Sequence, residues 1–265
     1  MRTLITGCST GIGRATAVEL TKRGHEVVAT ARRPETIEDL DVAQTLALDV
    51  TDDASVAAAL GSAGDVDVLV NNAGFGLHGP VEAVPLDEVK RLFETNVHGA
   101  VRMIQAVLPQ MRERGRGVVV NVSSIAGRVT APLGAFYSAS KYALEAISEG
   151  LHYEVGHFGI RVRIVEPGGF ETRFGDNRRV LGVDGPPYDE LDEQWAQASA
   201  KLQDPNAEPP GPEVVAQTIA DAVESDEAKL RWPVGADAEM VLGVRAQTDD
   251  ETFEATMREV LDLTW

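Results

Sequence analysis

The sequence contains 265 residues, 43% of them hydrophobic, which is enough for one large α/β domain with a sizeable core. Its formal net charge of −18 at pH 7 argues against nucleic acid or an anionic membrane surface as a partner. No apolar run approaches the ~20 residues that cross a bilayer, and a single cysteine, Cys8, excludes an internal disulfide and favours a cytoplasmic location.

Short β-branched runs alternate with helical segments along the chain. The predicted strands are Arg2–Thr6, Glu26–Ala31, Thr45–Leu48, Asp67–Asn71, Gly117–Ser123, Arg161–Glu166 and Leu230–Val234. The predicted helices cover residues 11–23, 52–61, 86–113, 135–157 and 213–224. This alternation, with nearly continuous apolar strands, predicts an α/β fold: a Rossmann-type, doubly wound parallel sheet of seven strands with helices on both faces. The chain runs straight into its first strand, so we expect no signal peptide.

We expect residues 1–265 to form a single dinucleotide-binding domain with two additions. Residues 173–212 are polar and rich in glycine and proline, which is typical of a lid over a substrate site. The apolar residues that would line such a site are Leu181, Val183, Tyr188, Leu191 and Trp195. Residues 236–265 are predicted to be a helical tail, and their sequence indicates no role.

The first predicted strand leads into a glycine-rich turn that opens a helix. Its spacing is G-x-x-x-G-x-G rather than the G-x-G-x-x-G of the general dinucleotide fingerprint. Glycines let the backbone approach a pyrophosphate, and the helix N-terminus stabilises the phosphate charge. The predicted cofactor contacts in this turn are Gly7, Ser9, Thr10, Gly11, Ile12 and Gly13.

The second predicted strand ends where an NAD enzyme would carry an acid for the ribose 2′-hydroxyl. Here Ala31 occupies that position and is followed by Arg32 and Arg33. Arginine can pair with a 2′-phosphate, so NADP(H) is favoured over NAD(H), which stays possible. The alternative is a pair of exposed arginines without a function. Residues 1–33 carry six basic side chains against two acidic ones, a local balance that suits a small anionic ligand.

Tyr137 and Lys141 are four residues apart in the predicted helix 135–157 and therefore share one face. An adjacent cation favours the phenolate and can lower the tyrosine pKa from ~10 by roughly one to three units. Such a pair could exchange a proton near neutral pH beside a hydride donor. Alone, however, this spacing occurs by chance in many solvated helices.

Taken in order, the motifs resemble those of the short-chain dehydrogenase/reductase family in its compact single-domain form. The resemblance covers residues 2–172 closely and 213–235 more loosely. The motifs are Thr6-Gly7 to Gly11-Ile12-Gly13, Leu48-Asp49-Val50, Asn71-Asn72-Ala73-Gly74, Asn96, Ser124, Tyr137 with Lys141, and Pro167-Gly168 followed by Thr172. The segment 231–235 is similar to the 17β-hydroxysteroid dehydrogenase-like and retinol dehydrogenase-like reductases.

This resemblance implies a role for each matching residue. Ser124 would hydrogen-bond the substrate carbonyl, and Tyr137 would give or take its proton. Lys141 would lower the tyrosine pKa and bind the nicotinamide ribose, and Asn96 would hold a water that links the lysine to solvent. The remaining implied cofactor contacts are Asp49 at the adenine, Val50, Asn72, Ala73, Gly74, Tyr137, Lys141, Pro167, Gly168 and Thr172, the last at the nicotinamide carboxamide.

The sequence therefore predicts an NADP(H)-dependent oxidoreductase that interconverts a ketone or aldehyde and an alcohol, with Tyr137 as general acid and base. Two alternatives stay open: a non-catalytic dinucleotide-binding redox sensor, and an NAD-dependent alcohol dehydrogenase working in the oxidative direction. The length and the glycine spacing disfavour a sugar-nucleotide epimerase.

The expected partners are few. We predict a hydrophobic small-molecule substrate, no membrane insertion, and a homodimer or homotetramer that forms, as in the family, through helices 86–113 and 135–157. The five histidines show no metal-ligand spacing, so no metal is expected, and His78 alone is placed where it could reach a substrate.

Overall fold

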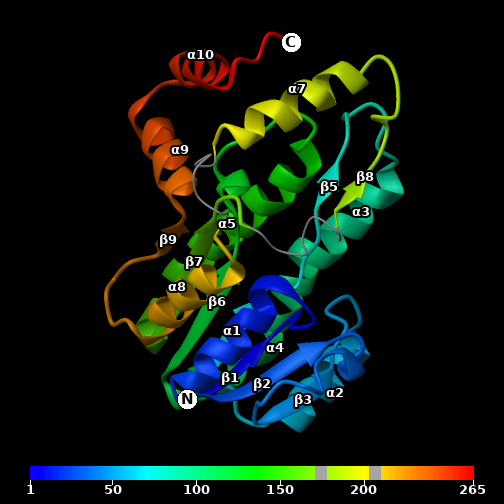
Figure 1. Ribbon diagram of the computed structural model, residues 1–265. Coiled ribbons are helices and arrows are strands. Elements are labelled where there is room, and N and C mark those ends of the chain that lie inside the picture. Colours follow the sequence, from blue (N-terminus) through cyan, green and yellow to red (C-terminus); the bar gives the residue numbers. More distant parts are fainter. Residues whose placement is uncertain (171–177, 203–209) are drawn as a thin grey trace.

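The computed structural model describes residues 1–170, 178–202 and 210–265 (Figure 1). Within these residues a seven-stranded parallel sheet runs in the order β3-β2-β1-β4-β6-β7-β9. Its strands are β1 (Arg2–Ile5), β2 (Glu26–Ala31), β3 (Gln44–Ala47), β4 (Val68–Asn71), β6 (Gly117–Val122), β7 (Ile160–Pro167) and β9 (Arg231–Val234). The predicted Rossmann-type sheet is confirmed, with each strand displaced by at most a residue or two at its ends.

Helices connect these strands and extend beyond them. They are α1 (Gly11–Lys22), α2 (Asp53–Ala63), α3 (Leu86–Phe93), α4 (Gly99–Arg114), α5 (Ala135–Val155), α7 (Asp189–Ala200), α8 (Pro212–Glu224), α9 (Ala236–Gln247) and α10 (Asp250–Leu261). The predicted helical segment 86–113 is found as α3 and α4, which a π-helical turn, Glu94–His98, joins without a break in the helical backbone. Among the described residues, no helix is long and apolar enough to span a membrane.

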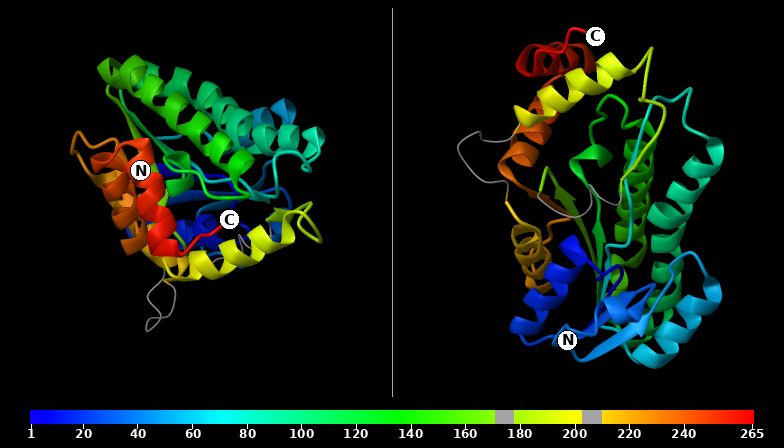
Figure 2. Two further views of the ribbon diagram at one scale, coloured as in Figure 1. Left: turned by 90° about the horizontal axis from the view of Figure 1, so that it is seen from above. Right: turned by 45° about the vertical axis from the view of Figure 1, so that its right-hand side comes forward.

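The sheet is covered on both faces, as a buried parallel sheet requires (Figure 2). One face packs against α1 and α8, through residues such as Leu20 and Ile219. The other packs against α2, α4 and α5, through residues such as Val56, Met103 and Leu151. Every residue of β6 is buried, and valine predominates in it, as expected for a strand covered on both faces.

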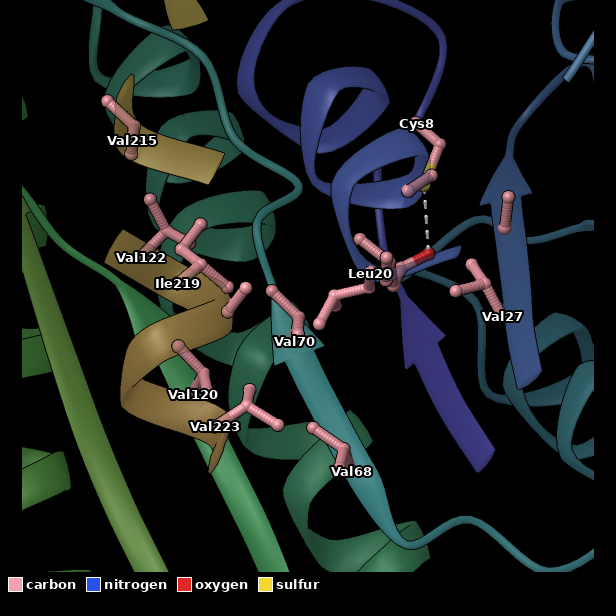
Figure 3. Close-up of a cluster of buried hydrophobic side chains, with 14 of the residues drawn as sticks. Cys8, Leu20, Val27, Val68, Val70, Val120, Val122, Val215, Ile219 and Val223 are labelled. Carbon is pink, nitrogen blue, oxygen red and sulfur yellow. Dashed lines mark hydrogen bonds between the residues drawn. The ribbon is translucent and has the colours of Figure 1, made fainter. Parts of the chain in front are cut away.

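Cys8 belongs to the core between the sheet and the α1 side (Figure 3). Its side chain is fully buried, and its thiol donates a hydrogen bond to the Ile5 carbonyl at 3.4 Å. Burial raises the pKa of the thiol to about 12. Cys8 therefore stays protonated and packs as a small apolar residue, in agreement with the absence of any redox motif around it.

Where the structure describes it, the region predicted to be a lid contains a strand and a helix. Arg179–Val180 forms strand β8, which pairs with β5 (Leu77–His78) in a small parallel sheet, and α7 follows. Helix α7 lies on the side toward which the central strands run, between β8 and α10 (Figures 1 and 2). Residues 171–177 and 203–209, including Thr172, lie outside the described residues. The tail is helical, as predicted, and consists of α9 and α10.

Candidate active site

Two glycines of the glycine-rich turn between β1 and α1, Gly7 and Gly13, have no space for a side chain. Gly7 has a φ of +75°, and a Cβ added to it would lie 2.9 Å from the Cα of Ala73. A Cβ on Gly13 would lie 2.4 Å from the side-chain nitrogen of Asn72. The first turn of α1 carries no acidic side chain, and Thr10 makes no side-chain capping bond. The turn therefore presents backbone and the positive end of a helix, which fits a pyrophosphate.

Hydrogen bonds join this turn to the end of β4. The Thr6 hydroxyl oxygen accepts bonds from the backbone N–H groups of Asn72 at 3.0 Å and Ala73 at 2.9 Å. The Asn72 amide donates in return to the carbonyls of Thr6 and Gly7, at 2.9 and 3.1 Å. The order of strands reverses between β1 and β4, and ligands of open α/β sheets bind at such a reversal.

The carboxyl ends of β2 and β3 carry opposite charges. Arg32 and Arg33 are exposed just after β2, and Asp49 follows β3. Burial raises the pKa of the Asp49 carboxyl, but hydrogen bonds from Thr51 and attraction to Arg32 and Arg102 lower it below its usual value overall. Arg32 therefore lies close enough to Asp49 for their charges to interact.

Asn96 lies in the π-helical turn between α3 and α4. Its side-chain oxygen accepts a hydrogen bond from the N–H of Phe75 at 3.0 Å. Its amide nitrogen donates to the Phe75 carbonyl at 3.0 Å and to the Ser140 hydroxyl at 3.2 Å. Ser140 in turn donates to the Tyr137 carbonyl at 2.7 Å. Asn96 thus connects the loop after β4 to the helix that carries Tyr137 and Lys141.

Ser124 and Tyr137 meet at the carboxyl end of β6. Their side chains share a hydrogen bond, and Ser124 also donates to the Pro167 carbonyl at 3.4 Å and accepts from the N–H of Ala126 at 3.1 Å. The neighbouring Ser123 is buried instead, with 3% of its surface exposed. The structure therefore brings Ser124, rather than Ser123, to the phenol.

Lys141 is buried one helical turn after Tyr137. Its ammonium donates a hydrogen bond to the Val122 carbonyl at 2.9 Å and lies 5.8 Å from the centre of the Tyr137 ring. Burial lowers the pKa of Lys141 to about 8, while attraction to Glu145 opposes that change.

The expected lowering of the tyrosine pKa is not found in this structure. Loss of water around the phenol raises the pKa of Tyr137 to about 12, and the hydrogen bond with Ser124 only partly offsets it. Lys141 does not compensate, because its ammonium is bonded to Val122 and is itself destabilised by burial. In this structure, burial of the phenol outweighs the lowering of its pKa that helical spacing led us to expect.

The loop after β7 is held by β9 and by the first turn of α9. The N–H of Gly168 donates to the Val234 carbonyl at 3.0 Å, and that of Gly169 donates to the Asp237 carboxylate at 2.6 Å. A Cβ on Gly168 would lie 2.2 Å from a carboxylate oxygen of Asp237, so the Asp237 side chain packs directly against this glycine. Pro167 and Gly168 thus lie beside Ser124, at the same edge of the sheet as the glycine-rich turn.

Comparison with known proteins identifies the family. Residues 2–180 match the family model described as short chain dehydrogenase. The chain belongs to this family. A 3-ketodihydrosphingosine reductase from Bacteroides thetaiotaomicron is 44% identical over 193 residues, 71% of each chain. Human retinol dehydrogenase 8 is 44% identical over 187 residues, which cover 64% of this chain and 59% of the human protein.

Solved structures of other short-chain dehydrogenases share the whole fold. One from Streptomyces avermitilis has a TM-score of 0.80 and 39% identity, and the match covers 97% of this chain and 98% of that one. One from Burkholderia cenocepacia in complex with NADP has a TM-score of 0.78, 26% identity and coverage of 97% and 96%. A 3-ketoacyl-(acyl-carrier-protein) reductase from Brucella melitensis, complexed with NADH, has a TM-score of 0.73, 26% identity and coverage of 88% and 95%.

The sequence did not single out every residue that builds the site of this short-chain dehydrogenase. Ser140 and Asp237 hold the tyrosine helix and the loop after β7, yet each is an ordinary residue of a helix in the sequence. Glu145 could have been found, because it lies one turn beyond Lys141 on the same face of α5. Among the described residues, no group of three or more metal-ligating side chains is present.

Proposed function

We propose that this short-chain dehydrogenase reduces a ketone or aldehyde with NADPH and catalyses the reverse alcohol oxidation. The observation that carries the proposal is the hydrogen bond between Ser124 and Tyr137 beside the buried Lys141. This group lies at the edge of the sheet where the glycine-rich turn forms a cradle for a dinucleotide. A proton donor and a hydride-carrier site at one edge are what carbonyl reduction requires.

When bound, the dinucleotide supplies the hydride. The hydroxyl of Ser124 would orient the carbonyl oxygen of the substrate, and the O–H of Tyr137 would protonate that oxygen as the alkoxide forms. A tyrosine pKa of about 12 keeps the phenol protonated at neutral pH, which suits the reductive direction. Lys141 would place a positive charge beside the nicotinamide ribose, and Asn96 would connect it to solvent through a water. Thr172 would contact the nicotinamide.

A preference for NADP(H) rests on Arg32 and Arg33, which lie exposed at the end of β2 where a 2′-phosphate would lie. Gly7, Ser9 to Gly13, Asp49 and Val50, Asn72 to Gly74, and Pro167 and Gly168 would complete the cofactor site. Of the relatives with known structure, the Burkholderia protein binds NADP and the Brucella protein binds NADH, so the family accommodates both.

A hydrophobic substrate is supported by the surroundings of the tyrosine. The side chain of Tyr137 packs in an apolar cluster with Phe75, Phe136 and Leu181, and Leu181 comes from the proposed lid. The names of two relatives point the same way, since ketodihydrosphingosine and retinol are both long apolar molecules. We therefore place the substrate among ketones or alcohols with an extended apolar group, beneath the lid 173–212.

Assembly and location complete the proposal. Helices α4 and α5 line a surface groove that includes Ile104, Leu108 and Ile147, which would bury apolar area between two copies of the chain. A homodimer or homotetramer working in the cytoplasm is the expected form.

The substitution Tyr137→Phe tests this function. It removes the proton donor without changing the shape of the ring, so we expect carbonyl reduction to fall about 10²- to 10⁴-fold. NADPH binding, measured by fluorescence titration, should stay unchanged. Tyr153→Phe is the matched control, because Tyr153 lies on the same helix with 83% of its surface exposed. Equal turnover by the two variants would contradict the assignment, and NADPH binding without turnover of any carbonyl by the unmodified protein would favour a redox sensor.

A further inference from the structure

Two glutamates are buried behind the catalytic lysine. Glu145 on α5 has 4% of its surface exposed, and Glu166 on β7 has 1%. In each carboxyl group the Oε1 atom is buried and makes no hydrogen bond of good geometry, and the same holds for the Ser123 hydroxyl beside them. Their contacts are looser: Ser123 interacts with Glu145, and Arg128 and Arg231 approach Glu166. Buried polar atoms of native proteins are nearly always paired, so unpaired carboxyl oxygens in one place call for a physical explanation.

The two arginines that contact these carboxyl groups, Arg128 and Arg231, are partly exposed to water, which weakens their attraction to the carboxylates. Arg231 on β9 contacts Glu145 at 3.1 Å and Glu166 at 3.4 Å, and it also binds Glu149, whose side chain is half exposed. Arg128, directly after the short 3₁₀ turn Ile125–Gly127, reaches Glu166 at 3.5 Å with 42% of its side chain exposed. The two buried acids therefore share Arg231, and the second arginine beside Glu166 is more exposed to water.

Two carboxylates in such a site repel each other, so one of them favours its neutral form. Burial is the larger cause and the charge of Glu145 the next, and together they raise the pKa of Glu166 to about 7 against the opposing arginines Arg128 and Arg231. The pKa of Glu145 is raised as well, chiefly by burial. Because the two groups titrate as a pair, one proton between them at neutral pH is the expected state.

Glu145 also lies against the lysine. It follows Lys141 by one turn on the same face of α5, and its negative charge raises the pKa of the lysine. Both residues surround Gly127: a Cβ there would lie 2.9 Å from the Cγ of Glu145 and 3.2 Å from the Lys141 carbonyl. The same Cβ would lie 2.8 Å from the hydroxyl of Ser123, next to Ser124. Glu145 and Glu166 thus lie behind the residues of the candidate active site, next to Ser123 and Lys141.

We propose that Glu166 holds a proton at neutral pH, that Glu145 in consequence stays ionised, and that Glu145 keeps Lys141 as an ammonium. Glu145 and Glu166 are then positioning residues that act through the lysine. The inference rests on the proposed function for its kinetic consequence, but not for its claim about the proton.

Infrared spectroscopy tests whether Glu166 is protonated, and the measurement needs no substrate turnover. Near pH 6 the unmodified protein should show the C=O stretch of a buried carboxylic acid, and this band should be lost in Glu166→Gln. It should remain in Glu149→Gln, which removes an exposed carboxylate from the same arginine. A missing band in the unmodified protein, or a band that persists in Glu166→Gln, would overturn the assignment of the proton. Circular dichroism of each variant checks that the fold is intact.

The pH dependence of kcat/KM for carbonyl reduction tests the action on Lys141. Without the charge of Glu145 the ammonium is less stable, so its pKa falls and the basic limb of Glu145→Gln should move down by on the order of one pH unit. Glu149→Gln should keep the limb of the unmodified protein. A limb that does not move in Glu145→Gln would refute the positioning role. If no variant turned over any carbonyl, the proposed function would fail while the infrared result still stood.

Discussion

At the scale of single residues, we expect Arg32, directly after β2, to set the preference for NADPH over NADH. Arg32→Ala removes a guanidinium that can bond a 2′-phosphate, and hydrogen bonds to charged groups contribute about 1.5 to 3 kcal/mol. We therefore expect KM for NADPH to rise roughly 10- to 100-fold, with KM for NADH nearly unchanged. Initial-rate kinetics with both cofactors measures this. Arg116→Ala, which alters a side chain 74% exposed at the far end of the sheet, is the control. Comparable losses with NADH would show that Arg32 does not recognise a 2′-phosphate.

Some properties of single residues follow from the sequence alone, whereas others depend on the folded structure. Gly7 and Gly13 were identified from their spacing, because a turn that approaches another backbone needs glycine whatever the rest of the fold does. The effect of Lys141 on Tyr137 could not be obtained in that way. Helical spacing places the two side chains on one face, but burial and the bond of Lys141 to the Val122 carbonyl determine both pKa values. This burial comes from packing against other elements, such as the end of β6 at Val122, which helical spacing alone does not show.

At the scale of elements, helix α7 is held at both ends over the side of the molecule that carries the site. Nε2 of His78 in β5 lies 2.6 Å from Oδ1 of Asp192 in α7. Strand β8, which precedes α7, is held in turn by Arg179, whose Nε lies 3.1 Å from Oε2 of Glu88 in α3. Toward the other end, Lys201 donates to the Leu261 carbonyl of α10 at 3.2 Å. The tail, whose role the sequence did not indicate, therefore helps to hold α7, which belongs to the proposed lid.

The bond between His78 and Asp192 can be tested by Asp192→Asn. The change weakens the attachment of α7, so we expect KM for the carbonyl substrate to rise about three- to tenfold, since one hydrogen bond between side chains contributes roughly 0.5 to 1.5 kcal/mol. NADPH affinity should not change, because the helix lies away from the glycine-rich turn. Glu193→Gln alters the next, exposed residue of the same helix and serves as control. An effect on NADPH binding, or none on substrate KM, would count against the lid.

Elements differed in how well they could be predicted. The strands and α1, α2, α5 and α8 follow from hydrophobic periodicity, which the sheet and its covering helices enforce. The π-helical turn at Glu94–His98 carries no periodicity of its own. It is stabilised by contacts of Asn96 with Phe75 and Ser140, which join three separate segments. The pairing of β5 with β8 is equally non-local, since about a hundred residues separate the two short strands.

At the scale of the whole molecule, the groove between α4 and α5 is the expected contact between copies. Ile147→Glu places a charge in its apolar lining, and burying an unpaired charge costs several kcal/mol. We expect the oligomer to dissociate to monomers at micromolar concentration, as measured by light scattering. Lys90→Glu, on the exposed face of α3, should leave the mass unchanged. An unmodified protein that is already monomeric would contradict this mode of assembly.

The central claim is that the edge of the sheet carrying Ser124, Tyr137 and Lys141 transfers a hydride from NADPH to a carbonyl carbon. Mass spectrometry of the alcohol formed from an apolar ketone and NADPH deuterated at the transferable C4 position tests it directly. We expect one deuterium on the carbinol carbon per NADPH consumed, and labelled alcohol forming about 10²- to 10⁴-fold more slowly with Tyr137→Phe. An alcohol without label, or consumption of NADPH without any alcohol, would contradict it.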